Sequence, residues 1–147
     1  MPTHAEKRRL SYSAEQLYAL VADVESYPKF LPWCVAARVR QRTVEADKTV
    51  ELSDLVIGFK MLREKFTSKV ILTPGRIDVA YIEGPFKYLT NHWIFEAQND
   101  GSCVIDFMVD FEFRSKLLQH MMGALFNEAV KVMVGAFERR AQQIYGN

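Results

Sequence analysis

The stretch CVIDFMVDFEFRSKLLQHMMGALFNEAVKVMVGAFERRAQQIY, residues 103–145, contains the change of hydrophobic period that decides the fold. Between Cys103 and Phe113 every second residue is mostly apolar, which is typical of a strand with one buried face. From residue 115 to 145 the apolar residues recur at helical spacing and form a broad stripe that includes Val132 and Phe137. About 30 residues at 1.5 Å each would make a helix of roughly 45 Å, so we expect a sheet that curves to cover it.

The same alternation of apolar and polar residues runs back through residues 35–97. It breaks at turn-forming residues, namely Gly58, Pro74-Gly75, Gly84-Pro85 and Asn99-Asp100-Gly101. Together with the separate alternating runs that begin at Val35 and at Val50, these breaks predict six successive antiparallel strands that share one dry face and one wet face. A weaker pattern in residues 4–10 allows a seventh strand.

Residues 13–24 form a predicted amphipathic helix. Ser13 and Gln16 have the spacing of a capping box, and Pro28 and Pro32 prevent the helix from continuing. Together with the long C-terminal helix, these elements predict one α+β domain over residues 1–147. In that domain a curved antiparallel sheet would grip the C-terminal helix around an apolar cavity.

Strand alternation also assigns individual side chains to a face. The residues expected to face inward in one strand are Val50, Leu52, Asp54 and Val56. In the next strand Glu64 shares the inward face with Phe66 and Val70. The basic residues Arg38, Arg40 and Arg42 are expected on the wet face of their own strand.

Composition excludes several classes of protein. The chain has 147 residues and a net charge of +1, which fits one domain and is unlike a dedicated nucleic-acid binder. Two cysteines without a Cys-x-x-Cys pair and three scattered histidines favour a reduced protein without a metal site. No apolar run approaches the ~18 residues of a membrane span, and no signal peptide is visible. We therefore expect a cytoplasmic protein, at most peripheral at the inner membrane.

The loop at residues 26–34 is unusually apolar. It carries Tyr27, Phe30, Leu31 and Trp33 beside two prolines, whereas loops are normally polar and exposed. These side chains must pack under another element or line a cavity. A structural plug and a cavity wall or opening are both consistent with the sequence.

This loop also carries a family resemblance. The residues concerned are Tyr27-Pro28-x-Phe30-Leu31-Pro32-Trp33-Cys34, Ser68-Lys69-Val70, Gly84-Pro85-Phe86, Trp93-x-Phe95 and Phe137-Glu138-x-Arg140-Ala141. Together they resemble the coenzyme Q-binding branch of the START-like, polyketide-cyclase-like superfamily, which also includes bacterial proteins named ribosome-association toxins. The resemblance implies a helix-grip (START/Bet v 1-like) fold with about six or seven strands and a hydrophobic tunnel. It also implies binding of ubiquinone or a similar lipid, with no other cofactor required.

We expect the ligand to be bound by residues on the inward face of a strand, on the apolar face of the C-terminal helix, or in the apolar loop. Ordinary core packing also explains each of them taken alone, so the prediction concerns the set. Its members are Phe30, Trp33, Glu64, Tyr81, Phe86, Trp93, Phe95, Phe107, Phe111, Met122, Phe126 and Met133. Because few of them are polar, they favour an apolar ligand such as a prenyl chain.

No catalytic group is evident in the sequence, since no nucleophile stands beside a base. Glu64 and Asp54 are the inward-facing carboxylates, and a buried carboxylate needs a partner or a raised pKa. Each is interpreted as one member of a salt bridge, a polar contact to a ligand head group, or a general acid or base.

Two surface features suggest partners. Ile57 and Phe59 lie at a predicted hairpin tip, where they either enter a bilayer interface or pack on a neighbouring helix. The arginines at 38, 40 and 42, with other basic residues, form either a solvated face or a contact with ribosomal RNA.

The favoured interpretation is a non-catalytic carrier that supports respiration by holding a polyprenyl quinone between the sheet and the C-terminal helix. It requires an oily void between those two elements. The alternative is a ribosome-association protein that binds the large ribosomal subunit, and a further alternative is a small-molecule cyclase. No DNA partner is expected.

Overall fold

The computed structural model describes residues 3–59, 62–123 and 126–146 of the chain. Within them, seven strands form one antiparallel sheet in the order β1-β7-β6-β5-β4-β3-β2. Their bounds are β1 Thr3–Leu10, β2 Cys34–Val44, β3 Thr49–Phe59, β4 Leu62–Thr73, β5 Arg76–Glu83, β6 Phe86–Ala97 and β7 Cys103–Phe113. The predicted meander is confirmed for β2 to β7, and residues 4–10 do supply a seventh strand, β1, beside β7.

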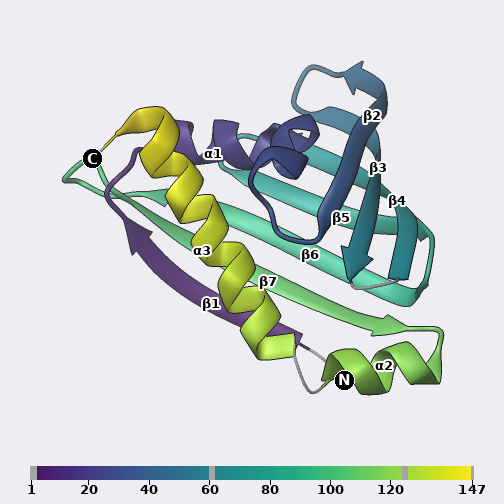
Figure 1. The fold of residues 1–147 in the computed structure, drawn as a ribbon. Helices are drawn as coiled ribbons and strands as arrows, with labels where there is room; N and C mark the ends of the chain where they lie inside the picture. Colours follow the sequence, from purple (N-terminus) through teal and green to yellow (C-terminus); the bar gives the residue numbers. More distant parts are fainter. Residues whose placement is uncertain (1–2, 60–61, 124–125, 147) are drawn as a thin grey trace.

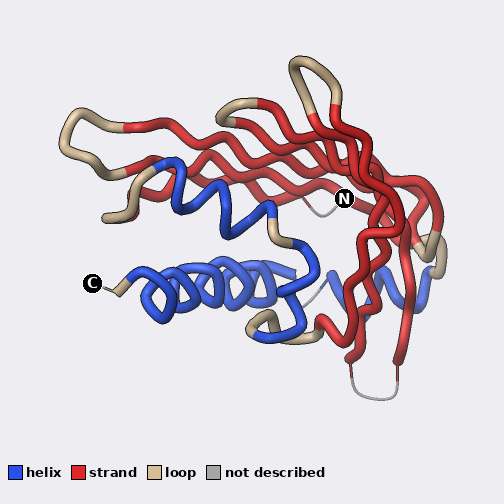
Figure 2. Tube along the Cα trace, turned by 90° about the horizontal axis from the view of Figure 1, so that it is seen from above, coloured by secondary structure: helices blue, strands red, loops and turns tan. Residues whose placement is uncertain are grey.

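The sheet curves strongly, and α1 and α3 lie on its concave side (Figure 1 and Figure 2). α1 (Ala14–Ala22) and the 3-10 helix η1 (Val24–Lys29) connect β1 to β2, while α2 (Lys116–Gly123) and α3 (Phe126–Tyr145) follow β7. The predicted capping box of α1 is confirmed. The Gln16 backbone N–H donates to Ser13 Oγ at 3.1 Å, and the Ser13 backbone N–H donates to Gln16 Oε1 at 3.0 Å.

The C-terminal segment forms two described helices rather than the one long helix predicted for residues 115–145. α2 ends at Gly123 and α3 begins at Phe126, and the two axes point in different directions (Figure 1). Gly123 therefore stands at the end of a helix, where its low helix propensity costs little.

α3 presents a narrower apolar stripe to the sheet than the sequence pattern predicts. Its buried residues include Val130, Val134, Phe137 and Ala141, at spacings of four, three and four. Val132, which was expected in the stripe, is 43% exposed. It lies about 200° around the helix from Val130, because each residue advances roughly 100°.

Trp93 is at the centre of the packing between α3 and the sheet. The centroid of its ring lies 4.6 Å from that of Phe107 on β7 and 5.1 Å from that of Phe137 on α3. Both contacts are edge-to-face, an arrangement that adds to the free energy gained by burial alone. All three side chains are buried.

The inward face of β3 is the opposite of the predicted one. Leu55 pairs with Phe66 and Glu51 pairs with Val70, and both partners belong to the hydrophobic core. The odd-numbered residues of β3 therefore face the concave side, and Val50, Leu52, Asp54 and Val56 face outward. The prediction was wrong because the outward-facing residues of β3 are more apolar than the inward-facing ones. The face that β3 turns inward is determined by its register with β4.

A bulge in β2 overturns a second face assignment. The register with β3 shifts between Val39 and Gln41, after which Arg42 stands opposite Glu51. Because a bulge adds one residue to a strand, the side chains beyond it change face. Arg42 is consequently on the concave side, whereas Arg38 and Arg40 remain on the outer face as predicted.

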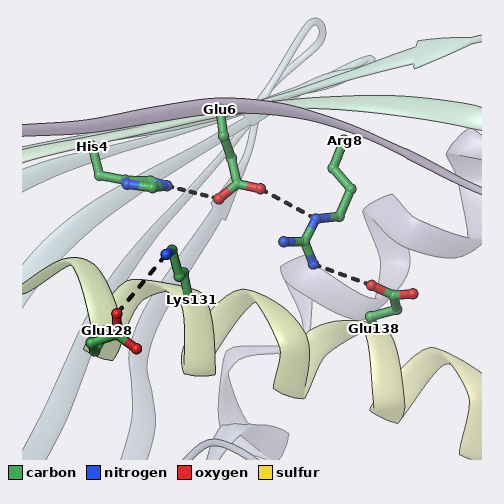
Figure 3. A network of polar contacts seen from close by, with 6 residues as sticks. All are labelled: His4, Glu6, Arg8, Glu128, Lys131 and Glu138. Carbon is green, nitrogen blue, oxygen red and sulfur yellow. Dashed lines mark hydrogen bonds and ion pairs between the residues drawn. The ribbon is translucent and has the colours of Figure 1, made fainter.

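The concave edge at β1 is polar and is bonded to α3 (Figure 3). His4 Nε2 lies 2.7 Å from Glu6 Oε1, and Arg8 Nε lies 3.2 Å from Glu6 Oε2. Arg8 Nη1 also donates to Glu138 Oε1 of α3 at 3.2 Å. Of these partly exposed pairs only Arg8–Glu138 links β1 to α3, and each adds little stability.

The packing of α3 makes a quantitative prediction for Phe137→Ala. Removing this buried ring should lower the free energy of unfolding by about 3–5 kcal/mol, since a cavity remains beside Trp93. Val132→Ala on the same helix is the control and should change it by no more than about 0.5 kcal/mol. Urea unfolding monitored by circular dichroism measures both values. Similar losses for the two variants would contradict the position assigned to α3.

Candidate functional site

A small apolar cavity lies among α1, α3 and the sheet. This enclosed cavity has a volume of about 20 Å³ and is lined by residues that include Leu17, Trp93, Phe107, Val134 and Phe137. This volume accommodates a single water molecule at most and no prenyl chain. The oily void expected beneath the C-terminal helix is therefore filled at this place by the aromatic core.

A much larger, open cavity of about 920 Å³ lies at the α1 end of the concave face. α1 forms one wall of it, and the hairpin tips β2–β3 and β4–β5 with the end of β6 form the other. Apolar side chains in the wall include Tyr18, Leu72 and Phe95, and the Tyr18 and Phe95 rings meet edge-to-face at 5.4 Å. The cavity thus combines an apolar wall with access to solvent.

Charged residues also line this open cavity, namely Glu15, Arg42, Glu45, Asp47, Lys48 and Glu51. Arg42 Nε lies 2.7 Å from Glu51 Oε2, and the Glu51 side chain is 4% exposed, against 57% for Arg42. Burial raises the pKa of the Tyr18 hydroxyl, and the nearby charge of Glu51 raises it further. The hydroxyl of Tyr18 is therefore a neutral hydrogen-bonding group beside a buried carboxylate.

Polar oxygens on the concave face of β3 and β4 are buried without a protein partner. They are Oε1 of Glu51, Oγ of Ser53 and Oγ of Ser68. Ser53 and Ser68 stand directly opposite each other in the β3–β4 pairing, and Glu51 is two residues from Ser53 on the same face. Strand alternation did not indicate this group, because it placed Val50 and Leu52 on the inward face and so Glu51 and Ser53 on the wet face.

The aromatic residues predicted to bind ligand divide into separate clusters. Trp93 and Phe107 line the small enclosed cavity, whereas Phe95 lines the open one. Phe86 packs edge-to-face on Tyr81 and on Phe111, at 5.5 Å in each case. These last three form a core cluster away from both cavities.

The other predicted members are placed differently. Phe30 packs on Phe137 at 5.2 Å, and Met133 is half-buried against the core. Glu64 faces the concave side opposite Ile57, as predicted, and is half-buried. The side chains of Met122 and Phe126 lie outside the described residues.

Asp54, predicted to face inward, lies instead on the outer face in a polar cluster. Thr67 Oγ1 donates to its Oδ1 at 2.6 Å, and Arg40 Nε lies 2.8 Å from its Oδ2. Burial alone would raise the pKa of Asp54, but the Thr67 hydrogen bond and the charges of Arg40 and Lys65 together lower it. Asp54 is therefore an ionised partner of basic residues and has no part in the concave site.

The apolar loop at residues 26–34 serves in part as a plug. Tyr27, Phe30 and Leu31 pack against the hydrophobic core, and the Tyr27 hydroxyl donates to the carbonyl of Val21. Trp33 is half-buried, with a backbone φ of 67°, a conformation that is costly for a residue with a β-carbon. Its carbonyl accepts a hydrogen bond from the Gly58 N–H at 2.8 Å, which fixes the loop to β3.

Ile57 is half-buried and packs against the same core, which favours packing within the protein over insertion in a bilayer, while a membrane contact through the hairpin tip stays a prediction. The Phe59 side chain lies outside the described residues. Among the helices described, none has the length and hydropathy required to cross a membrane. Nor do the described His, Cys, Asp and Glu side chains form a group of three or more suited to a metal ion.

The outer face of β2, β3 and β4 is rich in basic residues. Exposed side chains there are Arg38, Arg40, Arg63, Lys65 and Lys69, whereas Asp54 between them is buried. We call this group the outer basic strip. It lies on the opposite side of the sheet from the open cavity, so the two surfaces are independent.

Comparison with known proteins gives consistent matches. The family described as polyketide cyclase / dehydrase and lipid transport matches residues 10–138. Ribosome association toxin RatA of Vibrio cholerae serotype O1 is 38% identical over 138 residues, 93% of each chain. The mitochondrial coenzyme Q-binding protein COQ10 homolog B of Xenopus laevis is 36% identical over 148 residues, 97% of this chain and 59% of the frog protein.

A solved structure supports the same assignment. The solution structure of an 18 kDa protein from Caulobacter crescentus superimposes with a TM-score of 0.82 at 36% identity, over 100% of both chains. The matching relatives are named as toxins or binding proteins, while the family description also includes cyclases. The chain therefore belongs to the START-like polyketide cyclase/dehydrase and lipid-transport family, in the branch that contains ribosome-association toxins and coenzyme Q-binding proteins.

Proposed function

We propose that this protein binds a polyprenyl quinone or a closely related amphipathic lipid in the open cavity and carries it to membrane enzymes. The observation that carries the proposal is the cavity of about 920 Å³, with Tyr18, Leu72 and Phe95 in its wall and the Arg42–Glu51 pair among its charged residues. The apolar side chains would contact the tail, and the polar and charged side chains that also line the cavity would contact the head group.

Burial of the isoprenoid tail supplies the driving force for binding. A tail that buries ~400 Å² at ~25 cal/mol per Å² gains on the order of 10 kcal/mol before the entropy of association is subtracted. Because the cavity is open, part of the tail would stay accessible and the ligand could be transferred onward. The name of the frog relative, a coenzyme Q-binding protein, supports this ligand class.

The proposal predicts that organic extracts of the purified protein contain a polyprenyl quinone or related lipid in stoichiometric amount, measured by mass spectrometry. Ala97→Trp places a bulky ring in the cavity wall and should lower quinone retention roughly tenfold. Ala80→Trp is the matched control, since Ala80 is exposed on β5 outside the cavity.

Equal retention by the two tryptophan variants would place the ligand elsewhere. Protein that is free of lipid and does not take up added quinone would refute the carrier function itself.

The outer basic strip favours a second function, ribosome association. Its exposed cationic side chains, opposed by one buried carboxylate, suit the phosphate groups of RNA. Several relatives are named ribosome association toxins, among them the Vibrio cholerae protein. Because the strip and the cavity are on opposite faces, one chain can carry both functions.

This second function predicts that Arg38→Glu with Lys69→Glu weakens co-sedimentation with 50S ribosomal subunits. Each lost phosphate contact should reduce the slope of log affinity against log salt by about one. The control is Lys116→Glu with Lys131→Glu, which reverses two exposed charges on α2 and α3. Identical salt slopes for the two double variants would exclude the outer basic strip as the contact.

A further inference from the structure

The three unpartnered oxygens on β3 and β4 lie together on the concave face. Glu51, Ser53 and Ser68 are 3%, 2% and 3% exposed, and each has a side-chain oxygen without a hydrogen bond from the protein. Side chains directly opposite in antiparallel strands have β-carbons about 5 Å apart, and this spacing applies to Ser53 and Ser68. We call these three residues the β3–β4 polar group.

Glu51 connects this group to the open cavity. It belongs to the cavity wall, and its Oε2 is bonded to Arg42 at 2.7 Å while its Oε1 is unpartnered. Arg42 is long and 57% exposed, so its side chain can move without disturbing the core. Oε1 of Glu51 is itself buried, so a ligand in the cavity would reach it when the Arg42 side chain moves aside.

The hydroxyl group of Tyr27 does not donate a hydrogen bond to Glu51. Tyr27, whose pKa is raised mainly by its own burial and also by Cys34, Asp23 and Glu51, donates its hydroxyl proton to the Val21 carbonyl. A buried oxygen without a donor is unfavourable for the folded protein. Its presence at a position that is almost fully buried indicates a group that is completed by a bound molecule.

We propose that the β3–β4 polar group holds the head group of the ligand and selects a head group that donates a hydrogen bond, such as a quinol or another phenol, over one that can only accept. The proposal deepens the lipid-carrier function and rests on it. It assigns Glu51 as the residue that distinguishes the reduced from the oxidised form of a quinone.

The selectivity follows from the chemistry of the groups. An ionised carboxylate only accepts hydrogen bonds, whereas a serine hydroxyl can donate or accept. A quinol hydroxyl can donate to Glu51 Oε1 and also accept from Ser53 or Ser68. A quinone carbonyl has no proton to donate, so it would leave Glu51 Oε1 unpaired and place one acceptor against another.

The experiment compares the affinities of ubiquinone-2 and of its quinol, prepared by borohydride reduction, by anaerobic titration calorimetry. The wild-type chain should bind the quinol at least tenfold more tightly, a difference of about 1.4 kcal/mol. Glu51→Gln should reduce this preference to less than about threefold, because the amide can donate to a quinone carbonyl as well as accept from a quinol.

Glu83→Gln is the matched control, since Glu83 is exposed at the end of β5 and lines neither cavity. It should keep the full preference for the quinol. Should Glu51→Gln fail to fold, as judged by circular dichroism, Ser53→Ala with Ser68→Ala replaces it and should weaken binding of the quinol at least tenfold.

The outcomes separate this inference from the carrier function. Wild-type protein that binds both forms with equal affinity overturns the selectivity and leaves the carrier function standing. Unchanged quinol preference in Glu51→Gln, or unchanged quinol affinity in the double serine variant, overturns the role of the β3–β4 polar group. Absence of binding by either form defeats both proposals together.

Discussion

The edge-to-face packing of Phe137 on Trp93 is the contact on which the arrangement of the site depends. It joins the middle of α3 to the centre of the concave face, and Phe107 on β7 completes it. Because these rings leave a cavity of only about 20 Å³, the space around them is core. The larger cavity lies at the α1 end of the concave face, between α1 and the ends of β3, β4 and β6.

The position of the two cavities explains why polar and apolar groups can share the concave face. Near α3 the sheet is covered by aromatic rings, and the polar residues of β1 lie at the edge, where Arg8 reaches Glu138. Toward β3 the cover consists of α1 and η1, and here Glu51 and the two serines are buried. The helices thus divide one concave face into a structural part and a part with unsatisfied hydrogen-bonding capacity.

The two sides of the sheet have separate chemistry. The carboxylates Glu51 and Asp54 are only three residues apart, yet they face opposite sides and have different partners. Asp54 is surrounded by Thr67, Arg40 and Lys65, which lower its pKa and complete its hydrogen bonds. Glu51 has one oxygen bonded to Arg42 and the other without a protein donor. Of the two, only Glu51 retains capacity for a ligand.

The sequence by itself determined the α+β class, the antiparallel meander and the capping box at Ser13, because each depends on local period or on residues a few positions apart. It also selected core residues such as Trp93 and Phe107, whose alternation is unambiguous in β6 and β7. Only the tertiary structure decided the faces of β3 and of Arg42. In β3 both alternating sets contain apolar residues, so pairing with β4 was needed, and in β2 a bulge changes the face without a local signal. The position of the cavity was also decided by the tertiary structure. How tightly α3 packs on the sheet depends on contacts such as Trp93–Phe137, between residues more than 40 positions apart in the sequence.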